Sequence, residues 1–294
     1  MTDPALEARG EKVKKLVQRI EGLPTLPTLL AQMNRMMLDP KTTAKDMAQL
    51  ISSDPAVTSR ILKVVNSAFY GFPSRISTIT HAIVILGFNT VKSVVLSSSV
   101  FDAFGAKGKG DPRFKREDFW RHSVGCGAAC KVIARHAGEA ALEEFFIAGL
   151  LHDVGKVIED QFMHEDFVAI LEDVAVRKVL FREAEEARLG INHADIAGWL
   201  FGQWKLSKGL VKAVACHHNP SLADDHLKSA AIVHLGDIFA RTLMLGSGGD
   251  DQIPPISRVA WEALTLKAED FPVLLRETRR EMERSSVFLE FVPA

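Results

Sequence analysis

The stretch LEEFFIAGLLHDVGKVIEDQ, residues 142–161, carries both the helical periodicity and the polar side chains from which the fold and the site can be predicted. Its apolar residues recur at helical spacing, which predicts one continuous amphipathic helix: Phe146, Leu150, Val154, Val157 and Ile158. At about 100° per residue, His152 and Lys156 share a second face with Gly149, which leaves room above His152. Asp153 lies between the two faces. The segment therefore predicts a packed helix that presents a histidine, a carboxylate and a lysine together.

The same helical spacing recurs along nearly the whole chain. No stretch shows sustained alternation of apolar and polar residues with hairpin turns, as half-buried strands would. Asp54-Pro55 predicts a helix start, because aspartate at the N-cap accepts from free amides and proline in the first turn loses no hydrogen bond. Gly87 separates the expected helices 78–86 and 90–104. The sequence thus predicts an all-α protein, built as a multi-helix bundle.

A cluster of helix breakers divides the chain. Glycines recur from Gly105 to Gly110, and Pro112 follows shortly after them. The length of 294 residues suggests one or two domains, at roughly 150 residues each. We therefore expect an N-terminal helical subdomain, residues 1–105, and a C-terminal helical subdomain, residues 106–294.

Composition excludes several classes of protein. The 36 Lys and Arg balance 37 Asp and Glu, so the charge lacks the concentrated positive field that a nucleic-acid partner requires. The three cysteines form no CxxC pair, which disfavours a disulfide framework or a zinc knuckle. The start MTDPALEARG has no apolar core of a signal peptide, and runs such as 82–86 are shorter than the ~18 residues of a membrane span. We expect a cytoplasmic protein with no membrane partner.

Five histidines and two aspartates form the candidate metal site. Neutral imidazole and carboxylate oxygen are both usable ligands for a divalent cation of intermediate hardness. A helical bundle builds such a site by pointing side chains inward from several helices. The candidates lie on separate predicted helices: His122, His152, Asp153, His193, His217, His218 and Asp237.

Each candidate also has a simpler explanation when it is taken alone. His122 follows Trp120 and fits a histidine of the core, and Asp237 fits a surface carboxylate. His217 and His218 end a predicted helix, where a histidine can interact with the helix dipole. Lys156 fits an ordinary solvated lysine. The residues by themselves leave these alternatives open.

Several separated motifs in the chain resemble the HDOD family, the HD-related output domain of bacterial signalling proteins. The match extends from about residue 16 to residue 240 and preserves the order of motifs 23–27 (LPTLP), 53–66 (SDPAVTSRILKVVN), 79–87 (ITHAIVILG) and 204–207 (WKLS). The resemblance implies an all-helical fold whose second half is related to the HD phosphohydrolases. It also implies a role in signal transduction.

The resemblance further implies a role for each candidate ligand. Most HDOD proteins lack the metal ligands of the HD and HD-GYP phosphodiesterases, whereas this sequence keeps residues at the matching positions. His122 matches the ligand from the first helix, and His152 with Asp153 matches the namesake pair, in which the aspartate bridges two ions. The second ion would be held by His193, His217 and His218, and Asp237 matches the closing aspartate.

The implied chemistry is hydrolysis of a phosphate ester or a nucleotide. Two cations would lower the pKa of a bridging water and clamp phosphate oxygens, and Lys156 matches the lysine that lies beside the substrate phosphate. Asp153 and Lys156 are therefore the candidate catalytic residues. Iron or manganese suits the mixed ligand set, with zinc and magnesium as alternatives, and one or two ions fit. Asn219-Pro220-Ser221 replaces the segment that leads to a GYP motif, which disfavours cyclic di-GMP as the substrate.

A non-catalytic output or adaptor module is the competing hypothesis. In that case the metal is structural or absent, and the N-terminal half binds a signalling protein. The sequence leaves this choice and the oligomeric state open.

Overall fold

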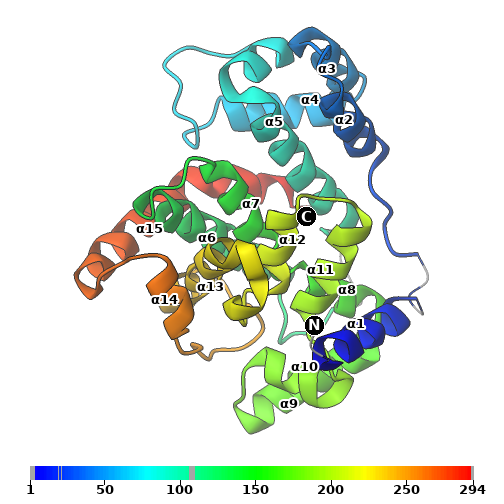
Figure 1. The fold of residues 1–294 in the computed structure, drawn as a ribbon, viewed down its shortest axis with the longest axis vertical. Coiled ribbons are helices and arrows are strands. Elements are labelled where there is room, and N and C mark those ends of the chain that lie inside the picture. Colours follow the sequence, from blue (N-terminus) through cyan, green and yellow to red (C-terminus); the bar gives the residue numbers. More distant parts are fainter. Residues whose placement is uncertain (1–3, 19, 21, 106–109, 293–294) are drawn as a thin grey trace. The chain divides into compact units, whose positions relative to one another are not determined.

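The protein is described by a computed structural model that covers residues 4–18, 20, 22–105 and 110–292. These residues form α-helices and short 3₁₀ turns, with one isolated bridge between Asp111 and Phe114 and no strand among them (Figure 1). The prediction of an all-α protein is confirmed.

The chain divides into two compact units. Unit 1 contains residues 1–23 and 107–279, and unit 2 contains residues 24–106 and 280–294. The expected subdomains, 1–105 and 106–294, differ from these units at both chain ends, and the expected boundary borders residues 106–109, which lie outside the described residues. Helix α1 (Pro4–Val17) belongs to unit 1 because Arg9 donates to Asp195 and Glu186 there, each at 2.9 Å.

In unit 2, a residue predicted from the sequence to cap a helix does so in the structure. The Asp54 carboxylate accepts from the amides of Ala56 and Val57 at 3.0 Å each, so the predicted N-cap is confirmed. The C-terminal 3₁₀ turn packs on α4, and its Phe288 makes an edge contact with Phe69 in the turn that follows α4. The elements are α2 (Thr28–Leu38), α3 (Ala44–Ser52), α4 (Pro55–Val65), α5 (Ile79–Phe104) and the 3₁₀ turn η3 (Ser286–Phe291).

Helix α5 is interrupted at Gly87, as the sequence predicts. Gly87 has φ 81° and ψ 164°, a backbone conformation that side chains with a Cβ rarely adopt. By length and composition alone α5 could cross a membrane, a test that core helices of soluble proteins also pass. Its second half is largely buried, including Val95, Val100 and Phe104.

Unit 1 is centred on α6, which lies against α7 and α13 (Figure 1). Small residues allow this close approach: a Cβ added to Gly149 or Gly236 would lie within 2.6 Å of the Cys130 sulfur. The remaining elements are α6 (Arg116–His136), α7 (Leu142–Leu151), α8 (Val154–Phe162), α9 (His164–Arg177), α10 (Phe181–Leu189), α11 (His193–Gln203), α12 (Lys208–Ala215), η1 (Pro220–His226), α13 (Leu227–Thr242), α14 (Arg258–Ala263) and η2 (Ala268–Asp270). Helix α15 (Phe271–Ser285) continues from unit 1 into unit 2.

The expected single helix 142–161 is wrong, because the chain breaks at His152 and Asp153. Asp153 has φ −100° and ψ 5°, and its carbonyl accepts from the amide of Lys156 in a tight turn. Gly149 also differs from expectation, since its Cα faces α6. The break directs the two polar residues inward from a turn between α7 and α8.

Gly155 sets the distance between α8 and α11, and its replacement provides a test of this packing. A Cβ there would lie 2.1 Å from the carbonyl oxygen of His193, so Gly155→Ala should destabilise the fold by about 2 kcal/mol or more. Gly202 in α11 has open space around it, so Gly202→Ala should stabilise by about 0.5–1 kcal/mol. Urea unfolding of both variants would measure the difference, and equal stabilities would contradict the packing.

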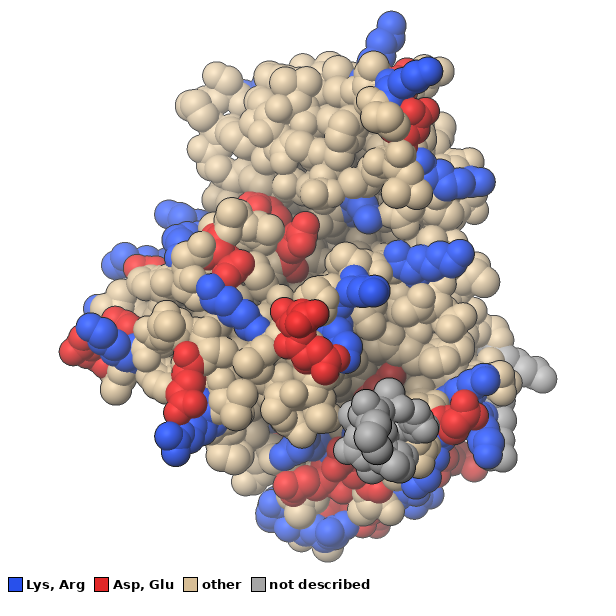
Figure 2. Space-filling view, viewed as in Figure 1, with Lys and Arg blue, Asp and Glu red and all other residues tan. Residues whose placement is uncertain are grey.

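The surface is mixed in charge. Figure 2 shows Lys and Arg interspersed with Asp and Glu over the visible face, in keeping with the formal charge of −1. Individual apolar side chains are exposed, including Leu38 and Val84 in unit 2.

Candidate metal centre

The structure brings the seven predicted ligands together inside unit 1. Each comes from a different position on the scaffold: α6 supplies His122, the α7–α8 break supplies His152 and Asp153, the start of α11 supplies His193, the segment after α12 supplies His217 and His218, and α13 supplies Asp237. We call these seven residues the His/Asp cluster. They span 116 residues of sequence (122 to 237), so only tertiary packing makes them neighbours.

Asp153 lies at the centre of the His/Asp cluster. Its Oδ1 atom is 2.9 Å from His193 Nε2, 3.4 Å from His152 Nε2 and 3.8 Å from His217 Nε2. Its Oδ2 atom is 3.8 Å from His122 Nε2. The two oxygens of one carboxylate therefore face imidazoles on opposite sides, the arrangement that a bridging ligand requires.

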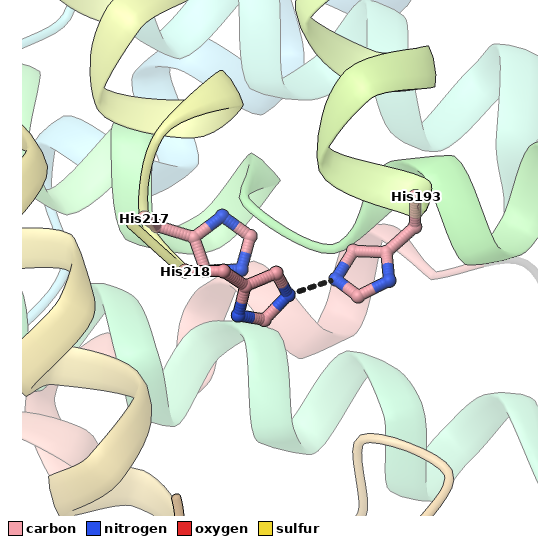
Figure 3. Close-up of side chains that lie close together, drawn as sticks. All are labelled: His193, His217 and His218. Atoms are coloured by element: carbon pink, nitrogen blue, oxygen red, sulfur yellow. Dashed lines mark hydrogen bonds between the residues drawn. The ribbon is translucent and has the colours of Figure 1, made fainter. Parts of the chain in front are cut away.

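Two groups of potential ligands surround this carboxylate. His122, His152 and Asp153 offer ligand atoms that all lie within 4.8 Å of one another, and Asp237 Oδ1 is 3.1 Å from His122 Nε2. The second group is His193, His217 and His218, which meets the same 4.8 Å criterion. Figure 3 shows these three rings turned toward one another, with His193 Nε2 and His218 Nε2 2.9 Å apart.

Buried polar atoms without hydrogen-bond partners mark the middle of the His/Asp cluster. Within the described part of the chain they include His122 Nε2, His152 Nε2, His217 Nε2 and Asp153 Oδ1. Buried polar groups are normally satisfied, because an unpaired one costs about 1–3 kcal/mol. Cations bound by the two ligand groups would give these atoms partners, so the donor set fits a metal.

Hydrogen bonds from the Nδ1 atoms, which face away from the His/Asp cluster, fix the orientation of His152 and His217. His152 Nδ1 donates to the Gly149 carbonyl at 2.7 Å, and His217 Nδ1 donates to the Val214 carbonyl at 2.7 Å. A carbonyl can only accept, so in the neutral ring Nε2 carries the lone pair. That lone pair points into the His/Asp cluster, as ligation requires.

Burial also determines the charge of these side chains. It lowers the pKa of His217 and His218 well below their usual range and that of His193 to about 4, so all three are neutral near pH 7. For His152, burial is opposed by the Asp153 carboxylate, which raises the pKa above its usual range. Although burial disfavours a charged carboxylate, the cations of His152 and Lys156 hold the pKa of Asp153 well below its usual range. A metal would take the place of the proton on His152.

A second carboxylate supports His193 from behind. Glu185 in α10 lies 2.7 Å from His193 Nδ1 and accepts from the His193 amide at 3.0 Å. Such carboxylate partners orient histidine ligands and raise their basicity. Sequence reasoning missed Glu185, since nothing in its local pattern indicates which helix it would contact.

Glu185→Gln tests this supporting role. The amide keeps the size of the side chain but replaces one of the two oxygens that face the His193 ring and amide with an NH2 group, so metal affinity should fall by about 10–100-fold. Glu183→Gln is the matched control, because Glu183 is exposed and contacts only the Leu180 amide at the start of the same helix. Competition with a metal-binding indicator would measure both affinities, and equal affinities would contradict the role.

Lys156 and Arg241 place two cations beside the His/Asp cluster. The Lys156 ammonium is fully buried and donates to Asp153 Oδ2 at 2.6 Å and to the Gly248 carbonyl at 2.8 Å. It is therefore not the solvated lysine of the simpler explanation. Arg241, one turn after Asp237 in α13, donates to Asp237 Oδ1 at 2.8 Å. Sequence reasoning missed Arg241, although its i,i+4 spacing from a candidate ligand was a usable signal.

The site is closed to solvent. No member of the His/Asp cluster is more than 3% exposed at its side chain, apart from the half-buried His218. A glycine-rich loop after α13 covers it, and a Cβ added to Gly248 would lie 3.3 Å from His122 Nε2. A narrow space of about 220 Å³ remains beside His193 and His218.

Unit 1 is thus an all-helical unit in which five histidines and two aspartates converge on one site. The sequence profile of the HDOD domain family matches residues 23–220, so this chain belongs to the HDOD domain family. The family predicted from the sequence motifs is thereby confirmed.

Relatives and solved structures agree with this assignment. An uncharacterized protein from Treponema pallidum (strain Nichols) is 26% identical over 241 residues, which cover 81% of this chain and 46% of that protein. The chain thus spans about half the length of this curated relative. An HDOD domain protein of unknown function from Geobacter sulfurreducens has a similar fold, with a TM-score of 0.78, 24% identity and coverage of 96% of this chain and 98% of that chain. A candidate phosphohydrolase from Shewanella amazonensis gives a TM-score of 0.72 at 24% identity, over 99% and 98% of the two chains.

Proposed function

We propose that this HDOD protein is a cytoplasmic signalling protein whose His/Asp cluster binds one or two divalent metal ions and hydrolyses a phosphate ester or a nucleotide. The observation that carries the proposal is the convergence of buried imidazole and carboxylate atoms, of which His122 Nε2, His152 Nε2, Asp153 Oδ1 and His217 Nε2 make no hydrogen bond of normal geometry. An apolar core would not contain such a set of polar atoms. A bound cation supplies the missing partner.

Two ions, if both bind, would each use one of the two ligand groups. His122, His152 and Asp237 would hold one ion, and His193, His217 and His218 would hold the other, with Asp153 shared between them. Iron or manganese suits the mixture of imidazole and carboxylate, with zinc or magnesium as alternatives. Bound metal ions would supply Lewis acidity toward a phosphate group and lower the pKa of water.

The remaining chemistry belongs to side chains of this chain. Lys156 carries a fixed positive charge next to Asp153 and would stabilise negative charge that develops on a phosphate oxygen. Arg241 holds the carboxylate of Asp237 in place. The similarity in fold to a candidate phosphohydrolase is consistent with this reaction type.

Metal content is the first test of the proposal. Protein purified without chelator or metal-affinity resin should carry about one to two equivalents of transition metal, because seven ligands exceed the needs of one ion. The loaded protein would then be screened against phosphomonoesters, nucleotides and cyclic di-GMP, with cyclic di-GMP expected to be a poor substrate. A metal-free protein after growth with added iron, manganese and zinc would contradict the proposal.

The closed site supports a second candidate function. The deep burial of His152, Asp153 and His193 suits a structural metal in a non-catalytic output module, with unit 2 binding a protein partner. In that case metal would be present, no phosphate ester would be hydrolysed, and loss of the metal would lower stability.

A further inference from the structure

The loop that covers the His/Asp cluster contacts it through main-chain atoms. We call residues Gly246 to Asp250 the plug. The Gly248 carbonyl accepts a hydrogen bond from Lys156 Nζ at 2.8 Å, and a Cβ at Gly248 would lie 3.4 Å from Asp153 Oδ2. The main chain therefore occupies the space next to the charged groups that a substrate would need.

Glycines allow this close approach. Gly246 has φ 72° and Gly249 has φ 103°, conformations that favour glycine. A Cβ at Gly246 would lie 2.1 Å from the Asp118 carbonyl, and one at Gly249 would lie 3.0 Å from the Phe181 ring. The plug is thus shaped to fit against α6 on one side and α10 on the other.

One aspartate latches the plug in place. Asp250 Oδ1 accepts from Arg241 Nη1 at 2.8 Å, and Asp250 Oδ2 accepts from the Phe181 amide at 3.0 Å. Asp250 Oδ1 also accepts from the Gln252 amide at 2.9 Å. None of the three donors belongs to a candidate metal ligand. The latch can therefore be altered without changing a ligand.

The plug separates the His/Asp cluster from a larger cleft. This cleft, about 610 Å³ including space open to solvent, is lined by Lys178, by Arg113, which is paired with Asp111, and by Ser247, Gly249, Asp250 and Asp251. The narrow space on the near side contains Lys156, Arg182 and Arg241. Cationic side chains thus lie on both sides of the plug.

We propose that the plug is a built-in competitor of the substrate, in which the Gly248 carbonyl occupies the place of a phosphate oxygen on Lys156. Release of the Asp250 latch would join the metal site to the cleft lined by Arg113 and Lys178. A phosphate oxygen is the stronger partner for the lysine, because it carries negative charge that attracts the ammonium, whereas the carbonyl oxygen is neutral. This inference rests on the proposed function, because it concerns access to the same site.

Asp250→Ala provides the test, with Asp225→Ala as its matched control because Asp225 is exposed in η1 and lines neither the cleft nor the narrow space. Each protein is loaded with metal, and the rate of metal removal by excess chelator is measured. Losing charge-assisted bonds should open the plug and speed removal by about tenfold or more in Asp250→Ala. The Asp225→Ala rate should equal that of the original protein. Gly249→Ala is a second opening variant, which acts through Phe181 and leaves Asp250 intact.

Affinity for inorganic phosphate is the second readout. Because the plug competes for Lys156, apparent phosphate affinity should rise in both opening variants and stay constant in Asp225→Ala. Unchanged removal rates and phosphate affinities in metal-loaded Asp250→Ala and Gly249→Ala would overturn the plug and leave the metal proposal standing. Absence of metal from the original protein would overturn both proposals.

Discussion

Asp153→Asn is expected to strip most of the metal from the protein while leaving its helices intact. Asparagine keeps the shape of the side chain but loses the charge and one of the two oxygens that face the imidazoles of His193 and His122. Loss of a supporting carboxylate alone costs about 10–100-fold in affinity, so loss of this shared ligand should cost more than about 100-fold. Elemental analysis and far-ultraviolet circular dichroism would measure metal content and helicity.

Asp225→Asn is the control for this prediction, because it is the same substitution at an exposed position in η1. It should retain the metal content of the original protein. His152→Ala should behave like Asp153→Asn, since it removes a nitrogen whose lone pair faces the same point. Full metal occupancy in both ligand variants would show that the ion lies elsewhere.

Lys156→Met is expected to separate catalysis from metal binding. Methionine fills similar space without the ammonium, so the metal should stay while phosphoesterase turnover falls by about 100-fold or more, the scale for one charge-stabilising contact in a preorganised site. The buried ammonium lies 2.6 Å from Asp153 Oδ2, close enough to reach an oxygen of a bound phosphate. Turnover and metal content would be measured on the same preparation.

Lys208→Met is the matched control, because Lys208 is exposed at the start of α12. Its turnover should equal that of the original protein. Equal turnover in Lys156→Met would exclude the lysine from the reaction and favour the adaptor function. Efficient hydrolysis of cyclic di-GMP would likewise contradict the substrate preference inferred from Asn219-Pro220-Ser221.

Local signals in the sequence were sufficient to predict many of the helices. Asp54 caps α4 and Gly87 interrupts α5 because capping and backbone conformation depend on residues within one or two turns. The candidate ligands could also be named in advance, since imidazole and carboxylate chemistry is a property of each residue. Their roles as metal ligands and catalytic groups stay predictions that the proposed experiments test.

Periodicity failed where tertiary contacts override it. The apolar stripe of residues 142–161 predicts one helix, yet the chain turns at His152 and Asp153 and continues as α8. Gly155 lets α8 lie against the backbone of His193, and Gly149 lets α7 lie against α6. These contacts join segments that are distant in the chain, so no pattern within a single helix records them.

The sequence by itself determined the helical class, the family and the chemical identity of the seven candidate ligands. Only the tertiary structure decided that Asp153 lies between two groups of imidazoles, that Glu185 supports His193, and that Gly248 covers Lys156. The physical reason is the range of the interactions. Helix formation and capping are set by neighbours in sequence, whereas convergence of side chains and closure of the site depend on close packing between segments that the chain brings together only when it folds.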